Sequence, residues 1–232
     1  MKDMNSAQSK SGLLLRSKLQ AFLFVAALFA LAVFFADCNS DYTPKPRAYF
    51  KIDLPEKKYQ LFDQQGYPYS FEYPVYSKIS KDSSLFEGNA DNPYWINIDF
   101  PQFGGRIYLS YKTIGGNSVY KLKTDKGYRD SISKNTFETL RDEAFKMTFK
   151  HSTKASSIED SAFVTPNGIA GVFFKVGGNA ATAHQFFATD TSKHFLRGAL
   201  YFDSTPNEDS LRVVNDFLQR DMVHMIETLK WK

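Results

Sequence analysis

Residues 185–202 read Gln-Phe-Phe-Ala-Thr-Asp-Thr-Ser-Lys-His-Phe-Leu-Arg-Gly-Ala-Leu-Tyr-Phe, which is two apolar runs separated by the polar stretch 190–193. Runs rich in Phe, Leu and Tyr that are bounded by turn residues predict a pair of antiparallel strands. Pro166-Asn-Gly168 and Gly177-Gly-Asn179 are further turn signals upstream. We therefore predict a meander with strands at Ser161 to Val164, Ile169 to Val176, Ala181 to Thr189 and His194 to Phe202.

The periodicity after this meander predicts a long amphipathic helix at the end of the chain. The stretch 205–208, Thr-Pro-Asn-Glu, supplies an N-cap, a proline in the first turn and a capping-box glutamate. Apolar residues then recur at helical spacing and form a stripe of Leu211, Val214, Leu218, Met222, Met225 and Leu229. Such a helix must pack its stripe against another element, and the strands are the available surface.

The segments before the meander alternate between apolar and polar residues. This pattern predicts strands at Tyr49 to Leu54, Tyr69 to Tyr73, Trp95 to Phe100 and Arg106 to Tyr111. Between Asn117 and Lys154 the period changes, and we predict one or two helices there, one of them starting at Asn135 with Glu138 in its first turn. The predicted fold class is α+β: an antiparallel sheet packed by a middle helix and a long C-terminal helix, in a single domain at residues 48–232.

The first 37 residues have the order of an export signal. Basic residues precede an apolar run of 16 residues, Ala21 to Ala36, which ends close to the only cysteine, Cys38. This run is shorter than the roughly 20 residues that a helix needs to cross a bilayer. We predict a lipoprotein signal peptide at 1–37, a lipidated Cys38, and an extended, proline-containing tether at 38–47. Asp37 departs from the small residues usual at this cleavage site, so an uncleaved N-terminal anchor with a free thiol is the alternative.

Composition limits the classes of partner and of chemistry. The chain has 29 basic and 25 acidic residues, and removal of residues 1–37 leaves 25 basic and 23 acidic ones. Nothing in this near-neutral balance suggests a nucleic-acid partner, which would need a basic patch or stripe. A single cysteine excludes an intramolecular disulfide and a cysteine-rich zinc site.

Few residues have a spacing typical of catalysis or of metal binding. Ser131-Ile-Ser-Lys134 has the Ser-x-x-Lys spacing of penicillin-binding proteins, but the companion motifs of that family are absent. His184 and His194 could face each other across the last hairpin, although a structural role is the stronger interpretation. Some carboxylates would serve a hydrolase if the fold paired them, namely Asp99, Glu138, Glu143 and Asp203. We assign no catalytic residue, no metal ligand and no cofactor.

Six short blocks in the mature chain carry a family likeness: Pro44-Lys-Pro-Arg-Ala-Tyr49, Ile52-Asp-Leu-Pro55, Asn97-Ile-Asp-Phe-Pro101, Tyr108-Leu-Ser-Tyr111, Gln185-Phe-Phe-Ala-Thr-Asp190 and Lys193-His-Phe-Leu-Arg-Gly-Ala-Leu-Tyr-Phe202. Together they resemble the gliding motility lipoprotein GldD family of Bacteroidota. The resemblance implies a protein without enzymatic activity that is needed to build or hold a gliding apparatus coupled to type IX protein secretion. The order of strands, middle helix, meander and long helix is also similar to the PsbP/Mog1 fold.

The resemblance sets the expected location and partners. The chain should be attached to a membrane of the cell envelope by acyl chains such as palmitate, with its domain facing the periplasm. It should bind other gliding motility and secretion lipoproteins and membrane proteins, but no nucleic acid and no small-molecule substrate. The expected partner-binding residues are Tyr49, Phe50, Lys193, His194 and Arg197. Two alternatives are a periplasmic hydrolase or glycan-binding lipoprotein, and a lipoprotein that carries a substrate in an apolar cavity between sheet and helices.

Overall fold

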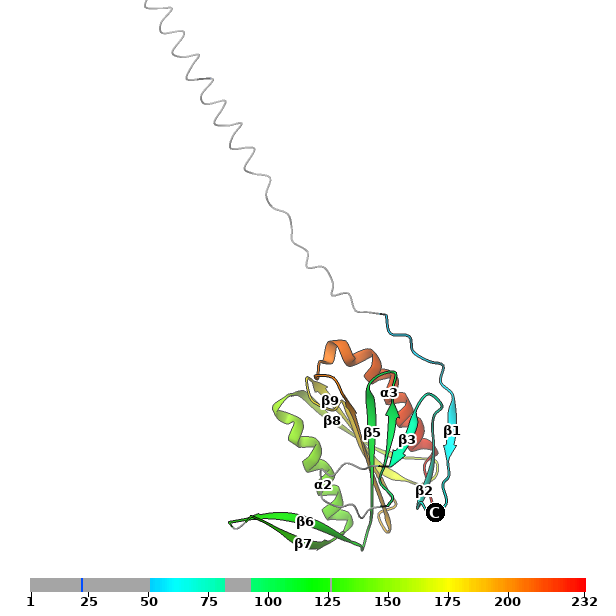
Figure 1. Cartoon of the computed structure of the whole chain (residues 1–232), viewed down its shortest axis with the longest axis vertical. Helices are drawn as coiled ribbons and strands as arrows, with labels where there is room; N and C mark the ends of the chain where they lie inside the picture. Colours follow the sequence, from blue (N-terminus) through cyan, green and yellow to red (C-terminus); the bar gives the residue numbers. More distant parts are fainter. Residues whose placement is uncertain (1–21, 23–50, 82–92, 126) are drawn as a thin grey trace, which may run out of the picture. The chain divides into compact units, whose positions relative to one another are not determined.

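The architecture is centred on a 7-stranded antiparallel sheet (Figure 1). The computed structural model describes residue 22 and residues 51–81, 93–125 and 127–232, and Lys51–Lys232 form one compact unit. Along the sheet, the strands are β3 (Lys78–Lys81), β4 (Ile96–Phe100), β5 (Gly105–Thr113), β11 (His194–Phe202), β10 (His184–Thr189), β9 (Ala170–Gly178) and β8 (Ala155–Val164). The α+β class predicted from the sequence is therefore confirmed.

Two smaller sheets and two long helices complete the described part of the chain. A 3-stranded sheet contains β1 (Tyr59–Phe62), β2 (Tyr69–Pro74) and β12 (Lys230–Trp231), and a 2-stranded sheet contains β6 (Asn117–Thr124) and β7 (Gly127–Lys134). The helices are α2 (Phe137–Phe149), which continues into the short 3-10 helix η2 (Lys150–Thr153), and α3 (Glu208–Thr228).

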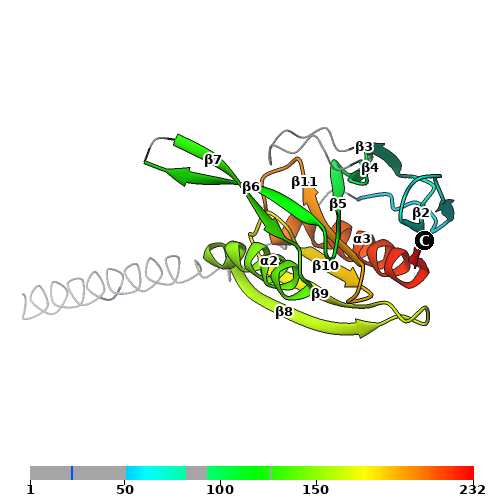
Figure 2. The same cartoon turned by 90° about the horizontal axis from the view of Figure 1, so that it is seen from below.

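The helices α2 and α3 cover opposite faces of the large sheet (Figure 2). Successive side chains of a strand point to opposite faces, and neighbouring residues of β10 show the division. Phe186 belongs to the larger core, which also contains Leu218 and Met222 of α3. Phe187 belongs to a smaller core with Leu140 of α2. The strands β10 and β11 are therefore buried on both sides, which explains their nearly continuous apolar sequence.

The turn between β10 and β11 is fixed by Asp190. Its Oδ1 accepts hydrogen bonds from the backbone N–H groups of Ser192, Lys193 and His194 at 2.8–3.0 Å. Within β11, Gly198 is paired with Phe186 of β10, and the Phe186 ring occupies the space that a larger side chain would need. The predicted hairpin, including the bounds of β11, is confirmed.

One prediction about secondary structure was wrong, and another was confirmed only in part. The described part of the predicted strand Tyr49 to Leu54, residues 51–54, is not a strand; the first strand is β1. The predicted helical region between Asn117 and Lys154 begins instead with the β6–β7 hairpin and contains one α-helix, α2. Both faces of the hairpin are largely solvent-exposed, so its sequence lacks the alternation of apolar and polar residues that a half-buried strand shows.

The helix starts also differ from the predicted caps. Thr136 caps α2 through a capping box with Thr139, whereas the Asn135 side chain accepts a hydrogen bond from the Ser118 hydroxyl at 2.7 Å. Asn207 caps α3 by accepting from the Ser210 N–H, so the predicted proline of the first turn, Pro206, precedes the helix. The apolar stripe of α3 is confirmed, since most of its residues are buried.

Candidate functional site

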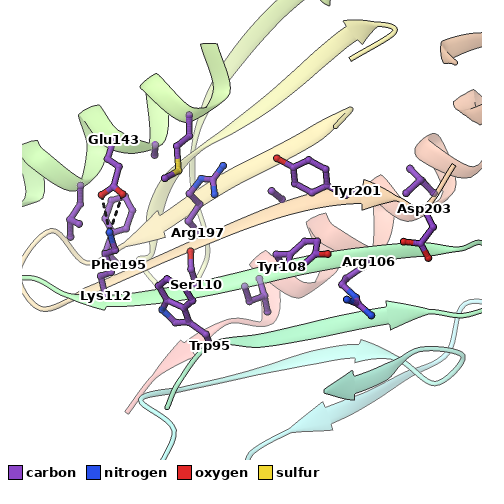
Figure 3. Close-up of a pocket in the computed structure, with 16 residues that line it drawn as sticks. Trp95, Arg106, Tyr108, Ser110, Lys112, Glu143, Phe195, Arg197, Tyr201 and Asp203 are labelled. Atoms are coloured by element: carbon purple, nitrogen blue, oxygen red, sulfur yellow. Dashed lines mark hydrogen bonds and ion pairs between the residues drawn. The ribbon is translucent and has the colours of Figure 1, made fainter. Parts of the chain in front are cut away.

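An open cleft of about 790 Å³ lies on the face of the large sheet that carries α2 (Figure 3). Its floor comes from β5 and β11, one wall from α2, and Trp95 lies at its border before β4. Its lining combines apolar groups with polar and aromatic ones, which are Trp95, Arg106, Tyr108, Ser110, Lys112, Glu143, Phe195, Arg197, Tyr201 and Asp203 among others. Concave sites of this size and mixed lining are typical of ligand and partner binding.

Strand alternation and register bring the floor residues together. Tyr108 and Ser110 point to the α2 face of β5, while the neighbouring Leu109 is buried in the larger core on the other face. Antiparallel pairing then places Arg197 of β11 opposite Ser110. Residues that are directly opposite in a ladder have adjacent side chains. The cleft is therefore a consequence of pairing β5 with β11, two strands that are distant in the sequence.

An ion pair closes one end of the cleft. The Lys112 ammonium group of β5 lies 2.9 Å from a carboxylate oxygen of Glu143 on α2, and both side chains are largely shielded from solvent. The pair links the helix to the sheet at this end (Figure 3). Because both side chains are shielded, salt screens this ion pair less than it screens an exposed surface pair.

Aromatic and guanidinium groups occupy the remainder of the floor. The rings of Tyr108 and Tyr201 meet edge to face with centroids 5.7 Å apart, and burial raises the pKa of Tyr201. Arg106 forms an ion pair with Asp99. Arg197 donates a hydrogen bond to the Gln185 Oε1 at 2.5 Å. These contacts hold the planar groups in fixed positions before any partner binds.

The family comparison covers almost the whole domain and begins directly after Cys38. Residues 39–231 match the family model of the gliding motility lipoprotein GldD. The chain belongs to the gliding motility lipoprotein GldD family. No curated protein matches the chain. Among solved structures, the solution structure of cyanobacterial PsbP (CyanoP) from Synechocystis sp. PCC 6803 is similar to 82% of this chain and to 100% of its own length, with 12% identity and a TM-score of 0.40.

The residues predicted to bind a partner in this GldD-family chain are in different environments. Cys38, Tyr49 and Phe50 lie outside the described residues, as do the segments 1–37 and 38–47 apart from residue 22. Lys193 is exposed in the turn before β11, and Arg197 lines the cleft. No helix in the described part of the chain is long and apolar enough to span a membrane.

His194 is a core residue instead of a surface contact. Its side chain is buried, its Nδ1 lies 2.7 Å from the Tyr111 hydroxyl, and its ring stacks on Trp231 at 4.9 Å. Burial lowers the pKa of His194. The ring therefore holds the C-terminal strand β12 against the large sheet and is not accessible to a partner.

The structure does not bring together the residues considered for catalysis. His184 begins β10 and His194 begins the antiparallel β11, so the two histidines lie at opposite ends of the hairpin. Ser131 and Lys134 belong to strand β7, where a separation of three residues places side chains on opposite faces. Glu143 and Asp203 line the cleft, whereas Glu138 is exposed in the first turn of α2. Within the described residues, no group of three or more His, Cys, Asp or Glu side chains could hold a metal ion.

A buried carboxylate on α3 was missed by the sequence analysis. The Oδ2 of Asp221 accepts a hydrogen bond from the Tyr76 hydroxyl at 2.6 Å, and its Oδ1 accepts one from the Tyr59 hydroxyl at 3.0 Å. The Lys57 ammonium group lies 2.7 Å from the same Oδ1 and 3.4 Å from the centroid of the Phe217 ring. The signal in the sequence is that Asp221 interrupts the apolar stripe of α3, three residues after Leu218. This network ties the start of the domain to α3.

Proposed function

We propose that the chain is a lipid-anchored, non-catalytic accessory protein that assembles or stabilises the gliding machinery coupled to type IX secretion. The observation that carries this proposal is the GldD-family match, which starts at residue 39, directly after Cys38. In this proposal residues 1–37 are removed as a signal peptide, Cys38 carries acyl chains including palmitate, and residues 38–47 are the tether of a domain at 48–232. The domain faces the periplasm of a bacterium of the Bacteroidota.

The cleft is the surface that we propose for binding another motility or secretion protein. Tyrosine, tryptophan and arginine are enriched at the energetic centres of protein interfaces, and the cleft presents Trp95, Tyr108, Tyr201 and Arg197. These groups are held by contacts within the domain, so little side-chain entropy is lost on binding. The proposed contact residue Arg197 belongs to this surface, and exposed Lys193 lies in the turn that leads into β11.

Several features of the cleft favour binding over catalysis. Glu143 is paired with Lys112, and Asp99 is paired with Arg106. A general base needs a free carboxylate or imidazole within hydrogen-bond reach of a substrate proton. Of the two carboxylates that line the cleft, Glu143 is engaged in an ion pair, and Asp203 follows the end of β11.

The replacement Cys38→Ala is expected to move the protein from the membrane fraction to the soluble fraction. Each buried methylene of an acyl chain contributes about 0.8 kcal/mol, so several chains make attachment effectively permanent. Fractionation of cells with quantitative blotting measures the shift, and a circular dichroism spectrum equal to that of the wild type shows that the domain still folds. If the variant stays in the membrane fraction like the wild type, the uncleaved N-terminal anchor becomes the better explanation.

Filling the cleft is expected to impair gliding without unfolding the domain. Ser110 lies on the cleft floor opposite Arg197, so Ser110→Trp places a bulky ring in the space proposed for a partner. We expect partner binding to fall at least about tenfold, which corresponds to about 1.4 kcal/mol. Gliding speed is measured in cells whose only copy carries the variant, beside Ser161→Trp on the exposed surface of β8 as the matched control. Equal gliding of both variants would exclude the cleft as the binding surface.

A glycan-binding function is the second candidate, because Glu143 and Asp203 line the same cleft as five aromatic side chains. Aromatic rings and carboxylates together suit a saccharide as well as a peptide. Isothermal titration with soluble cell-wall oligosaccharides distinguishes the two functions. Saturable binding that Ser110→Trp abolishes would favour the glycan, and binding of a motility protein alone would favour the accessory role.

A further inference from the structure

The β6–β7 hairpin projects from the body of the domain as a separate 2-stranded sheet (Figures 1 and 2). Its strands pair with each other from Asn117↔Lys134 to Thr124↔Gly127. In the described part of the chain no third strand joins either edge. The outer edge of β7 therefore presents backbone N–H and C=O groups that another strand could pair with.

Large apolar side chains on this hairpin are strongly exposed. Tyr128 is 72% exposed and Ile132 is 70% exposed, and Leu122 and Val119 are exposed to 47% and 41%. A two-stranded hairpin gains little stability in water by itself, so exposed apolar groups on such an element carry a cost that burial in an interface would remove. Exposed apolar clusters of this kind on a protein surface are typical of interaction sites.

The charge of the hairpin selects the kind of partner. Residues 117–134 contain five basic residues and two acidic ones, which gives a net charge of +3 in 18 residues. The rest of the mature domain is close to neutral, so this positive charge is local. A segment with an excess of Asp and Glu is the complementary partner, and charge complementarity of this kind increases both association rate and specificity.

We propose that the hairpin docks an acidic, extended segment of another protein, which pairs with the outer edge of β7 as an additional strand. Backbone pairing with an open strand is a known mode of peptide recognition. Every residue of β7 except Ser131 is exposed, so the strand is accessible along its length. The exposed Tyr128 and Ile132 contact the apolar residues of the added strand, and the basic side chains pair with its carboxylates.

The observations favour this partner over a second copy of the chain and over a membrane. Two copies would bring two hairpins of net charge +3 together, and like charges that face each other destabilise a pair of strands. A membrane contact would cover the face that carries Val119, Tyr128 and Ile132, but it would leave Leu122, on the opposite face, in water.

Two synthetic peptides of opposite charge test the proposal. The probes are fluorescent eight-residue peptides of alternating Glu and Val or alternating Lys and Val, added to the full chain carrying Cys38→Ala. We expect the acidic peptide to bind at least tenfold more tightly than the basic one and to slow amide hydrogen exchange in residues 127–134. In the double variant Lys123→Glu/Arg129→Glu the preference should reverse. Ser110→Trp should bind the acidic peptide like the wild type, so failure of the hairpin proposal is distinguishable from failure of the cleft proposal.

Other outcomes would overturn the proposal. Equal binding of both peptides, or protection of β5 and β11 instead of β7, would show that the hairpin does not select an acidic strand. Stronger binding of the same protein to vesicles of phosphatidylglycerol than to the acidic peptide would identify a membrane contact. Concentration-dependent dimers in sedimentation analysis that Ile132→Ser abolishes would identify a second copy as the partner.

Discussion

Replacement of Asp221 by alanine is expected to lower the free energy of unfolding by about 3–5 kcal/mol. Asp221 is 1% exposed and lies 2.7 Å from the ammonium group of Lys57. The variant leaves this partly buried cation without its carboxylate, and the hydroxyl groups of Tyr59 and Tyr76 lose their acceptor. Burial already lowers the pKa of Lys57, and Asp221 opposes this change. Chemical denaturation of the purified protein measures the loss.

The matched control is Asp216→Ala on the exposed side of the same helix. Exposed substitutions usually change stability by less than about 0.5 kcal/mol. If Asp221→Ala costs no more than Asp216→Ala, the network does not stabilise the fold. A large loss would instead show that the segment at Lys57 and Tyr59, where the chain enters the domain, is held firmly to α3.

The free energy of unfolding is expected to fall by about 3 kcal/mol as the pH is lowered from about 6.5 to about 4, because of His184. Burial lowers the pKa of His184 to about 4, and the charge of Lys175 acts in the same direction while Asp216 opposes it. The unfolded chain has an ordinary histidine pKa of about 6.5. Between these values the unfolded state binds a proton that the folded state does not bind. The stability that depends on the neutral, buried form of His184 is therefore fully present above about pH 6.5 and is lost as the pH falls toward about 4.

The variant His184→Gln isolates this contribution, because glutamine is polar and does not titrate. Denaturation curves for the variant and the wild type at pH 7 and at pH 4.5 should differ chiefly in their pH dependence, which should be flatter in the variant. Burial also lowers the pKa of His194 and of His151, so some loss at acid pH should persist. Parallel pH profiles of the two proteins would show that His184 has no role in acid sensitivity.

The parts of the fold that could be predicted are those in which burial leaves a pattern in the sequence. The residues of β10 and β11 are apolar because they are buried in the cores on both faces of the sheet, and the bounds of β11 were predicted to the residue. The stripe of α3 repeats at helical spacing because its residues from Val214 to Leu229 face the larger core. None of the side chains of the β6–β7 hairpin whose burial is described is buried, so its strands carry no such pattern, and the sequence predicted helices for this region instead.

The candidate site was predictable in part only. Arg197 was selected because it lies in the last hairpin, and it does line the cleft. The other wall depends on where α2 rests on the sheet, which is determined by contacts such as that between Leu140 and Phe187. The position of α2 on the sheet cannot be predicted from the spacing of residues along the chain. His194 was misjudged because alternation alone does not reveal that Tyr111 and Trp231 enclose its ring.

The central claim is that this GldD-family chain is a lipid-anchored protein that acts by binding other components of the gliding apparatus. Purification of the tagged full-length protein from native membranes tests it most directly, with mass spectrometry of the mature N-terminus and of the co-purified proteins. We predict a mature chain that begins at an acylated Cys38 and is recovered with gliding or type IX secretion components. An unmodified N-terminus on a protein recovered without such components would contradict the account.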